Sequence, residues 1–450
     1  MACSSVRSAV VDKVTAAPIT TLARGILPRT SRSSTTSAPR ATSSPILSST
    51  SPLPSPRPAS QNLIRTSSTA PVYSVSWPTH SSSSSNASSP PTAPATASTI
   101  TSKPSPAVVS PSRSNRFVPR NRRSLTSAGG HSNNWAILFP GQGSQFVGMG
   151  KDLYDAYPAA RQVVDEADDA LGGTLKHVMF EGSQEDLTRT ENAQPAILTT
   201  SIAMLRVLEL ERGFKIEDSC RYALGHSLGE YSALVATKAV TLQDAVKLVR
   251  LRGEAMTKAV TNKGTTAMSA LVVRSSKLEE LVKAMEEIRE TLPSGELAEI
   301  ANINSSFQVV ISGTVRGVDH ASRMLQARKI AARAVDLPVS APFHCSLMQP
   351  AADAMREALK DVEFKKPTIS VISNVTAKPI ENVEDISDLL VRQVTGTVQW
   401  HTSIAYLREQ EDVHDYISLG PGKVLANLLR KEYPTDFVKT VTTASDIEQW

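Results

Sequence analysis

The pattern of hydrophobic and polar positions changes near residue 135, where apolar runs begin after a long polar stretch. Trp135–Pro140 (WAILFP) is a short apolar run that ends in a glycine-rich turn, which predicts a buried strand. Beyond it, apolar residues recur at helical spacing between further short apolar runs. Helices are predicted at Gln162–Leu171, Ala193–Glu209, Leu228–Thr237 and Leu242–Ala259, and a strand at Arg221–Leu224.

The segment 263–339 has a different order of predicted elements. Its apolar pattern predicts strand, helix, strand, strand, helix, strand, which is typical of a ferredoxin-like unit. The strands are predicted at Thr266–Val273, Leu297–Asn304, Gln308–Gly313 and Ala331–Val339, and the helices at Leu278–Thr291 and Val318–Ala327. Afterwards the first pattern resumes, with helices predicted at Met348–Leu359 and Ile386–Val394 and strands at Ile369–Ser373 and Asp415–Leu419.

These elements predict an α/β protein in which a small subdomain is inserted into a larger one. We expect a disordered leader segment at residues 1–132 and one folded domain at 133–450. Within that domain the large subdomain would span 133–262 and 340–450, and the small ferredoxin-like subdomain 263–339.

The leader has a composition of its own. Residues 1–130 hold 14 Lys and Arg but a single acidic residue, Asp12, whereas the rest of the chain carries 34 basic and 42 acidic residues. The sequence pI of about 9.0 therefore reflects the leader and does not indicate a nucleic-acid-binding domain. A Ser-rich, Arg-bearing, acid-poor leader is typical of an organelle transit peptide, and we expect plastid targeting, with mitochondrial targeting or an ordinary disordered tail as alternatives.

Other classes of protein are disfavoured by composition. The three cysteines (Cys3, Cys220 and Cys345) show neither a disulfide framework nor a metal-ligand spacing. The sequence has no run of about 18 or more apolar residues, so we expect no membrane span.

One motif indicates nucleophilic catalysis. Gly225-His226-Ser227-Leu228-Gly229 fits the Gly-x-Ser-x-Gly pattern, in which small residues flank the serine because the turn is sharp. A predicted strand precedes the motif and a predicted helix follows it, as a nucleophile turn requires. Ser227 would lie at the N-terminus of that helix, where free N–H groups can stabilise an oxyanion.

A nucleophilic serine needs a base, and His344 is the best-placed candidate. It lies in a proline-containing segment directly after the strand predicted at Ala331–Val339. The ring of His226 is expected to point away along the turn. No acidic residue stands where a third triad member would precede His344, and Asp336 lies inside the predicted strand.

Six short motifs occur along the chain in a fixed order. They are Phe139–Gln145 (FPGQGSQ), Gly225–Tyr231 (GHSLGEY), Leu251–Gly253 (LRG), Ala301–Asn304 (ANIN), Ser340–His344 (SAPFH) and Gly420–Val424 (GPGKV). In these motifs the chain resembles the malonyl-CoA:acyl carrier protein transacylase family. The resemblance implies an α/β-hydrolase-like large subdomain carrying the ferredoxin-like one. It also implies transfer of malonyl from coenzyme A to the phosphopantetheine thiol of acyl carrier protein, through a malonyl-serine, for fatty-acid synthesis.

The same resemblance implies roles for matching residues. Ser227 corresponds to the acylated serine and His344 to its base, in a dyad whose histidine is oriented by a backbone carbonyl, here that of Gln393. A neutral acceptor can fix the histidine tautomer as a carboxylate would. The implied oxyanion hole consists of the backbone N–H groups of Gln142 and Leu228.

The resemblance also implies substrate-binding residues. Arg252 corresponds to the residue that selects the malonyl carboxylate, and a planar guanidinium can bind a carboxylate through two hydrogen bonds. Gln194 matches a pocket residue, and Asn302 and Asn304 match cleft-facing positions of the small subdomain. Phe343 resembles the malonyl-preferring pattern of related acyltransferase domains, whereas many stand-alone members have Ser there.

Three alternatives remain open on the sequence. A serine hydrolase, such as a thioesterase, would need no Arg252 and would admit water to the acyl-enzyme. A related acyltransferase would use a different acyl group, and a non-catalytic module would only bind the carrier protein. The inserted subdomain and the Gly-Gln-Gly-Ser-Gln loop favour a transferase.

The expected ligands are substrates. The segment at Lys423 lacks the GxxxxGK[ST] pattern of a nucleotide-binding loop, and no cofactor motif is found in the sequence. We therefore expect no cofactor and no metal, with the coenzyme A thioester as a substrate. The expected partners are malonyl-CoA and acyl carrier protein, and the expected oligomeric state is a monomer.

Overall fold

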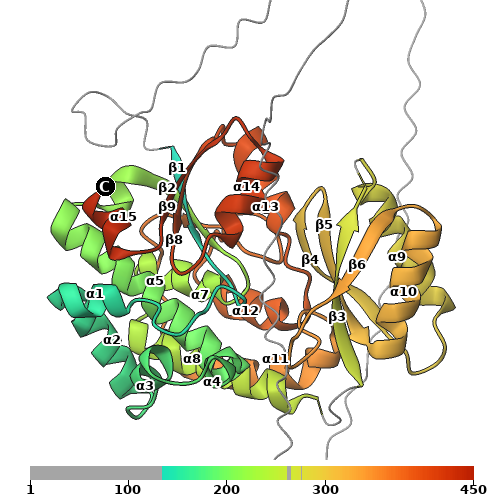
Figure 1. The fold of residues 1–450 in the computed structure, drawn as a ribbon, viewed down its shortest axis with the longest axis horizontal. Coiled ribbons are helices and arrows are strands. Elements are labelled where there is room, and N and C mark those ends of the chain that lie inside the picture. Colours follow the sequence, from blue (N-terminus) through green and yellow to red (C-terminus); the bar gives the residue numbers. More distant parts are fainter. Residues whose placement is uncertain (1–133, 261–264, 275) are drawn as a thin grey trace, which may run out of the picture. The chain divides into compact units, whose positions relative to one another are not determined.

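The computed structural model describes residues 134–260, 265–274 and 276–450. The predicted leader at 1–132 and the predicted start of the small subdomain at residue 263 lie outside the described residues. The described part comprises a large subdomain around a parallel sheet and a small subdomain around an antiparallel sheet (Figure 1).

The sheet of the large subdomain has five strands in the order β7-β2-β1-β8-β9, and every neighbouring pair is parallel. The strands are β1 (Trp135–Phe139), β2 (Cys220–Gly225), β7 (Ser370–Val371), β8 (Asp415–Leu419) and β9 (Phe437–Val441). Because the strands are parallel, their carboxyl ends meet at one edge of the sheet. The loops that carry the FPGQGSQ, GHSLGEY and GPGKV motifs leave from that edge.

Burial on both faces explains the apolar run of β1. All five of its residues are buried. Ile137 and Phe139 belong to the larger apolar core, whereas Ala136 and Leu138 belong to a second core with Trp400. Successive side chains of a strand point to opposite faces, so a central strand between two helix layers must be apolar throughout.

Helices cover the two faces of this sheet (Figure 1). The longer ones in the larger core are α2 (Pro158–Ala170), α5 (Thr190–Arg212), α7 (Gly229–Ala236), α8 (Leu242–Lys258), α11 (Gln349–Ala358) and α12 (Asp385–Thr395). The second core receives α13 (Trp400–Glu409) and α14 (Val424–Glu432). Shorter helices are α1 (Lys151–Ala156), α3 (Leu175–Phe180), α4 (Gln184–Thr188), α6 (Ile216–Ser219) and α15 (Ala444–Glu448), and single 3-10 turns lie at Ser346–Met348 and Leu359–Asp361.

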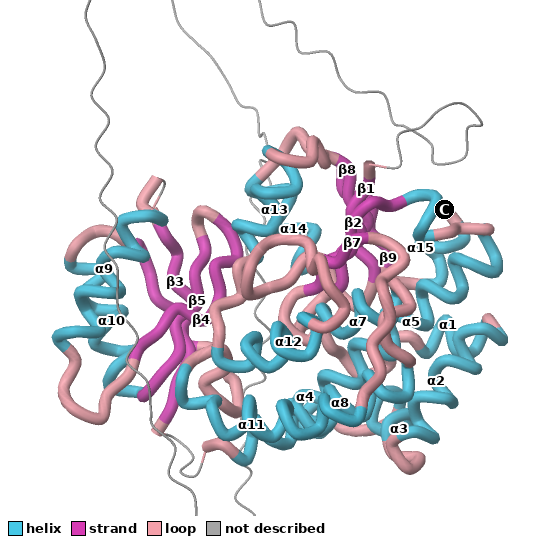
Figure 2. Tube along the Cα trace, turned by 180° about the vertical axis from the view of Figure 1, so that it is seen from behind, coloured by secondary structure: helices cyan, strands magenta, loops and turns pink. Residues whose placement is uncertain are grey.

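The small subdomain has the predicted ferredoxin-like topology. Its antiparallel sheet has the order β4-β5-β3-β6, made of β3 (Thr266–Val273), β4 (Ala298–Ser305), β5 (Gln308–Thr314) and β6 (Ala331–Asp336). Helices α9 (Leu278–Thr291) and α10 (Val315–Ala327) cover the face of this sheet that lies away from the large subdomain (Figure 2). The prediction of an α/β protein with an inserted βαββαβ unit is thus confirmed.

Several boundaries differ from the prediction. Strand β6 ends at Asp336 rather than at Val339, because Pro338 lacks the N–H that a ladder requires. Strand β7 is shorter than the predicted Ile369–Ser373, and α13, α14 and β9 were not predicted. In the described part of the chain, no helix is long and apolar enough to cross a bilayer.

Candidate active site

The turn between β2 and α7 holds Ser227 in a left-handed backbone conformation, with φ at 53°. Gly225 makes this turn possible, because a Cβ there would lie 1.9 Å from the carbonyl carbon of Gly229. The strand therefore runs into the helix at a distance that only glycine allows. The predicted strand–turn–helix setting of Ser227 is confirmed.

Asn374, three residues after β7, clamps this turn. Its Oδ1 accepts the backbone N–H of Ser227 at 2.7 Å, and its Nδ2 donates to the carbonyl of Gly225 at 2.7 Å. Both polar ends of one buried side chain thus hold the strained turn. Asn374 was not predicted as a site residue, and its only signal in the sequence is a polar residue directly after the predicted strand Ile369–Ser373.

Ser227 and His344 are in hydrogen-bond contact. Ser227 Oγ lies 2.8 Å from His344 Nε2, and His344 Nδ1 lies 2.8 Å from the carbonyl oxygen of Gln393. A carbonyl only accepts, so Nδ1 carries the proton and the lone pair of Nε2 faces the serine hydroxyl. The Gln393 carbonyl lies in the last turn of α12, where carbonyl groups have no partner inside the helix.

The environment of His344 keeps its imidazole neutral. The residue is 4% exposed. Burial, followed by the positive charge of Arg252, lowers the pKa of His344 to about 3. A neutral imidazole with a free Nε2 lone pair can accept the proton of the serine hydroxyl.

Arg252 reaches the same serine oxygen from α8. Its side chain is buried, with 1% of the residue exposed, and Nη2 donates to Ser227 Oγ at 3.0 Å. Nη1 donates to Gln194 Oε1 at 2.8 Å, and Nη2 also donates to Gln393 Oε1 at 2.7 Å. Arg252 is thus held by two neutral amides, and in the described part of the chain no carboxylate makes an ion pair with it.

Two backbone N–H groups remain available next to the nucleophile. Within the described residues, neither Gln142 nor Leu228 donates its backbone N–H to another group. The N–H of Ser227 is already taken by Asn374. The side chain of Gln142 is anchored separately, by donation to Thr190 Oγ1 at 3.2 Å. The pair predicted for the oxyanion hole is therefore free to donate to a developing negative charge.

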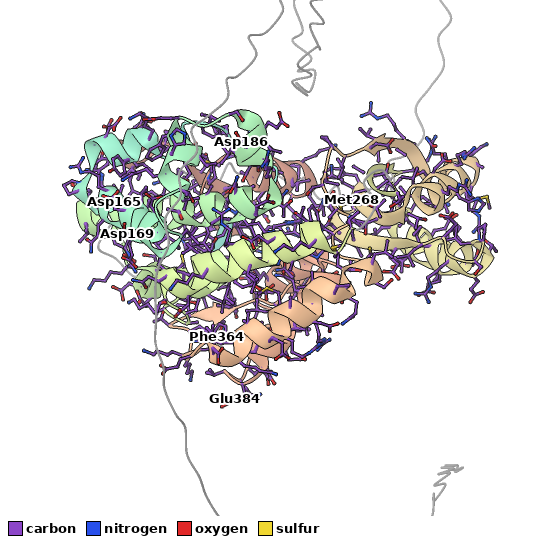
Figure 3. All side chains as sticks on the ribbon, turned by 90° about the horizontal axis from the view of Figure 1, so that it is seen from below. Asp165, Asp169, Asp186, Met268, Phe364 and Glu384 are labelled. Atoms are coloured by element: carbon purple, nitrogen blue, oxygen red, sulfur yellow. The ribbon has the colours of Figure 1, made fainter. Side chains whose placement is uncertain are left out.

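A cleft of about 310 Å³ opens over this site, with walls from both subdomains. Met268 of β3, labelled in Figure 3, lines it where the small subdomain meets the large one. Of the residues predicted to bind substrate, four line the cleft: Gln194, Arg252, Asn302 and Phe343. The remaining wall is mostly apolar, from Met256, Leu337, Pro338 and Val339.

Asn304 lies outside the lining of this cleft, unlike its predicted position. Its Oδ1 lies 2.8 Å from Nε2 of His226, and its Nδ2 donates to Gln308 Oε1 at 3.2 Å. His226 is among the residues that line the cleft, whereas its ring contacts Asn304 and lies 5.7 Å from the ring of Trp400, neither of which lines it. The expectation that this ring points away from the site stays a prediction. The Asn304 side chain is engaged in a contact with His226 that joins the two subdomains beside the cleft.

Glu230 is a second residue that sequence reasoning missed. It is fully buried in α7, and burial raises the pKa of its carboxyl group to about 7. Its signal was a carboxylate within the otherwise uncharged α7, a helix buried at every position. In the described part of the chain, no group of three or more His, Cys, Asp or Glu side chains could hold a metal ion.

Comparisons with known proteins agree on one family. Residues 136–447 match the family model of the acyl transferase domain. The malonyl CoA-acyl carrier protein transacylase of Bacillus subtilis (strain 168) is 45% identical over 66% of this chain and 89% of its own length. The Escherichia coli (strain K12) protein of the same name is 41% identical over 66% of this chain and 92% of its own length.

Solved structures give the same result. An acyl-carrier-protein-S-malonyltransferase from Bartonella henselae has a TM-score of 0.65 and 43% identity, covering 70% of this chain and 98% of its own. A malonyl-transacylase solved in complex with a type II polyketide synthase acyl-carrier protein has a TM-score of 0.65 and 36% identity, with coverage of 70% and 98%.

Proposed function

The chain belongs to the acyl transferase domain family, and we propose on that premise that it transfers malonyl from malonyl-CoA to acyl carrier protein. Relatives with that name match its folded part over most of their own length. The observation that carries the proposal is the convergence of two groups on one serine oxygen. Ser227 Oγ meets the unprotonated Nε2 of His344 at 2.8 Å and the guanidinium of Arg252 at 3.0 Å.

The first half-reaction forms a malonyl-enzyme. His344 Nε2 takes the hydroxyl proton as Ser227 Oγ attacks the thioester carbonyl of malonyl-CoA. The carbonyl oxygen becomes an oxyanion, which accepts hydrogen bonds from the N–H groups of Gln142 and Leu228. When the tetrahedral intermediate collapses, the carbon–sulfur bond breaks and the coenzyme A thiolate leaves with the proton from His344. Malonyl remains esterified to Ser227.

The second half-reaction reverses these roles. The phosphopantetheine thiol of acyl carrier protein gives its proton to His344 and attacks the ester carbonyl. Collapse of the second tetrahedral intermediate breaks the bond to Ser227 Oγ, which recovers the proton from His344. The carbonyl of Gln393 keeps the imidazole in the same tautomer throughout, because it accepts from Nδ1 in both steps.

Arg252 is the proposed carboxylate-binding residue. Its guanidinium faces the serine oxygen on which malonyl is carried, and the nearby wall offers apolar groups and amides. A buried cation with amide partners favours an acyl group that brings its own negative charge. Gln194, Asn302 and Phe343 complete the proposed acyl-binding wall. Asn304 is proposed to hold the ring of His226 in place through the contact between Oδ1 and Nε2.

The test is intact-mass measurement of the purified protein shortly after mixing with malonyl-CoA. We expect a mass increase of one malonyl group, which disappears on addition of the holo form of acyl carrier protein as that protein gains the malonyl group. Ser227→Ala should form no adduct and should keep the thermal stability of the wild type. Release of free malonate instead of malonyl transfer would support a serine hydrolase and contradict the proposal.

The composition of residues 1–132 supports a separate proposal for location. This acid-poor, Ser-rich leader would direct the protein to plastids, with the mitochondrial matrix as the alternative destination. A fluorescent reporter fused behind residues 1–132 should accumulate in plastids of plant cells. Mitochondrial fluorescence would select the alternative, and cytosolic fluorescence would contradict organelle targeting altogether.

The protein is further proposed to act as a monomer. The proposed nucleophile, base, carboxylate-binding residue and oxyanion donors all come from one chain. Light scattering during size-exclusion chromatography should give the mass of one chain at concentrations where the enzyme is active. A dimer that does not dissociate on dilution would contradict this proposal. The proposed reaction uses no metal and no cofactor, because coenzyme A enters only as part of the substrate. Activity should therefore survive extensive dialysis against a chelator.

A further inference from the structure

A buried hydrogen-bond relay connects Arg252 to Glu230. Arg252 Nη2 donates to Gln393 Oε1 at 2.7 Å, and Gln393 Nε2 donates to Glu230 Oε2 at 2.7 Å. The same Nε2 also donates to the carbonyl oxygen of Ser227 at 2.9 Å. All four residues belong to different parts of the active site: α8, α12, the nucleophile turn and α7.

The chemistry of the partners fixes which way the Gln393 amide points. A guanidinium only donates, so it must face Oε1, and a carbonyl only accepts, so it must face Nε2. Glu230 Oε2 accepts the second hydrogen of Nε2 and also the backbone N–H of Asn374 at 3.2 Å. The carboxylate thus ties the Gln393 side chain to the residue that clamps the Ser227 turn.

The relay leaves the guanidinium near a carboxylate without pairing the two directly. Burial lowers the pKa of Arg252, and the charges of Tyr231 and Glu230 oppose this shift. The contact between Arg252 and Glu230 nevertheless runs through a neutral amide. A direct Arg–Glu pair would neutralise the guanidinium charge that a substrate carboxylate needs. The Gln393 amide occupies one Nη2 hydrogen but carries no charge, so the positive charge of Arg252 stays available to a substrate carboxylate.

We propose that Glu230 is a positioning residue that holds the guanidinium of Arg252 at Ser227 through the side chain of Gln393. The inference rests on the proposed malonyl transfer, because malonyl is the acyl group that needs this guanidinium. Without the Glu230 acceptor, one buried hydrogen of Gln393 Nε2 has no partner and the side chain leaves its position. Arg252 then loses the contact that directs Nη2 towards the serine.

The hydrogen bonds that join the carboxylate to Gln393 and to Asn374 both fall on one oxygen, Oε2. Glutamine at position 230 can present its own carbonyl oxygen at that place, with its NH₂ group where the other oxygen was. The required property is therefore an acceptor rather than a negative charge. The inference therefore predicts different malonyl preferences for two substitutions of similar size, Glu230→Gln, which keeps an acceptor, and Glu230→Met, which does not.

The experiment measures kcat/KM for acyl-enzyme formation from malonyl-CoA and from acetyl-CoA, and compares the ratio of the two values. Glu230→Met should lower the malonyl preference by about tenfold or more, which corresponds to about 1.4 kcal/mol. Glu230→Gln should keep the preference within about threefold of the wild type. Gln393→Met retains its backbone carbonyl and should match Glu230→Met, which provides a second variant if the first does not fold.

A double substitution distinguishes positioning from general damage. If Glu230 acts through Arg252, then Glu230→Met combined with Arg252→Ala should have the same preference as Arg252→Ala alone. The matched control is Glu432→Met, which removes a carboxylate with 10% of its side chain exposed that accepts from Ser306. It should leave the preference unchanged even if it lowers stability.

Three results would overturn the inference: an unchanged preference in Glu230→Met, equal losses for both acyl groups, or a further drop in the double variant. Glu230→Gln behaving like Glu230→Met would also overturn it, because the charge would then be what matters. A wild-type protein that forms no malonyl adduct would instead reject the proposed function. The two failures are therefore separable in one set of measurements.

Discussion

Arg252 donates a hydrogen bond to Ser227 Oγ at 3.0 Å, so the proposed selectivity residue touches the proposed nucleophile itself. In the proposed reaction this oxygen becomes the ester oxygen of the acyl-serine, which would place the guanidinium beside the new acyl chain. The proposal thus links selection of the acyl group and attack on the thioester at one atom.

The first prediction concerns this guanidinium. Arg252→Ala would leave the malonyl carboxylate desolvated without a partner, which costs about 3–5 kcal/mol for a buried charge pair. Malonyl transfer should fall by roughly 10² to 10³ or more, since each 1.36 kcal/mol is about tenfold. Acetyl transfer should be kept or should rise, because acetyl has no carboxylate. The measurement is the ratio of kcat/KM for the two thioesters.

Two further variants serve as references for that result. Arg252→Lys should restore only part of the preference, because an ammonium cannot make a two-pronged contact. Arg250→Ala removes a half-buried arginine of the same helix that donates to Asn192, and it should leave the preference unchanged. Equal losses for both acyl groups in Arg252→Ala would mean that Arg252 is structural and that selectivity has another source, such as Phe343 or Gln194.

The second prediction is the pH dependence of acylation. Burial and the Arg252 charge lower the pKa of His344 from its ordinary 6.5 to about 3, so the base stays unprotonated throughout the neutral and mildly acidic range. The pH profile of kcat/KM for adduct formation should therefore show no loss of activity around pH 6.5. The profile should also be measured in Glu230→Gln, because burial raises the pKa of Glu230 to about 7 and this group titrates in the same range. A loss of activity near pH 6.5 that persists in Glu230→Gln would contradict the prediction.

The same shift has a consequence for stability. Between about pH 3 and 6.5 the unfolded chain binds a proton at His344 that the folded chain does not. The contribution of His344 to the free energy of unfolding is therefore fully present above about pH 6.5 and decreases as the pH falls. His344→Gln should remove this part of the acid sensitivity, as measured by urea unfolding at several pH values.

The third prediction concerns the turn. Gly225→Ala would place a Cβ 1.9 Å from the backbone of Gly229, and backbone cannot move aside as a flexible side chain can. We expect a loss of at least about 1–3 kcal/mol in the free energy of unfolding, the usual effect of overpacking, together with loss of the malonyl adduct. Wild-type stability and adduct formation in Gly225→Ala would show that the turn tolerates a wider approach.

The fourth prediction concerns the leader. The residues of the proposed site lie between Gln142 and Gln393, so a chain that begins at Ser132 should retain adduct formation and its unfolding temperature. Both can be measured beside the full-length chain. A large decrease in unfolding temperature would mean that residues before Ser132 contribute to the stability of the folded part.

The nucleophile turn could be predicted from the sequence because its signals are local. The apolar strand ending at Gly225, the small residues around Ser227 and the following helix lie within a short stretch of chain. The βαββαβ order of the small subdomain was predictable for a similar reason, since each element shows its own periodicity. By contrast, the pattern at Trp400, Ile404 and Leu407 does follow helical spacing, and the helix there was missed.

The contacts across the site could not be predicted from local patterns. Gln393 makes hydrogen bonds with His344, Ser227, Arg252 and Glu230, which lie 49 to 166 residues away in the sequence. Its backbone role entered only through the family resemblance, and its side-chain role entered only with the structure. A buried glutamine within a helix gives no local sequence signal from which its partners could be identified.

The hydrogen bond that orients His344 does not depend on the side chain of its partner residue. Its acceptor is the main-chain carbonyl of Gln393, which every amino acid possesses, so no substitution at that position deletes it. An alanine scan would remove the side-chain relay of Gln393 but would not reveal the carbonyl. The proposed dyad therefore depends on a group that no side-chain substitution removes, and only changes that shift the backbone at the end of α12 can break the contact.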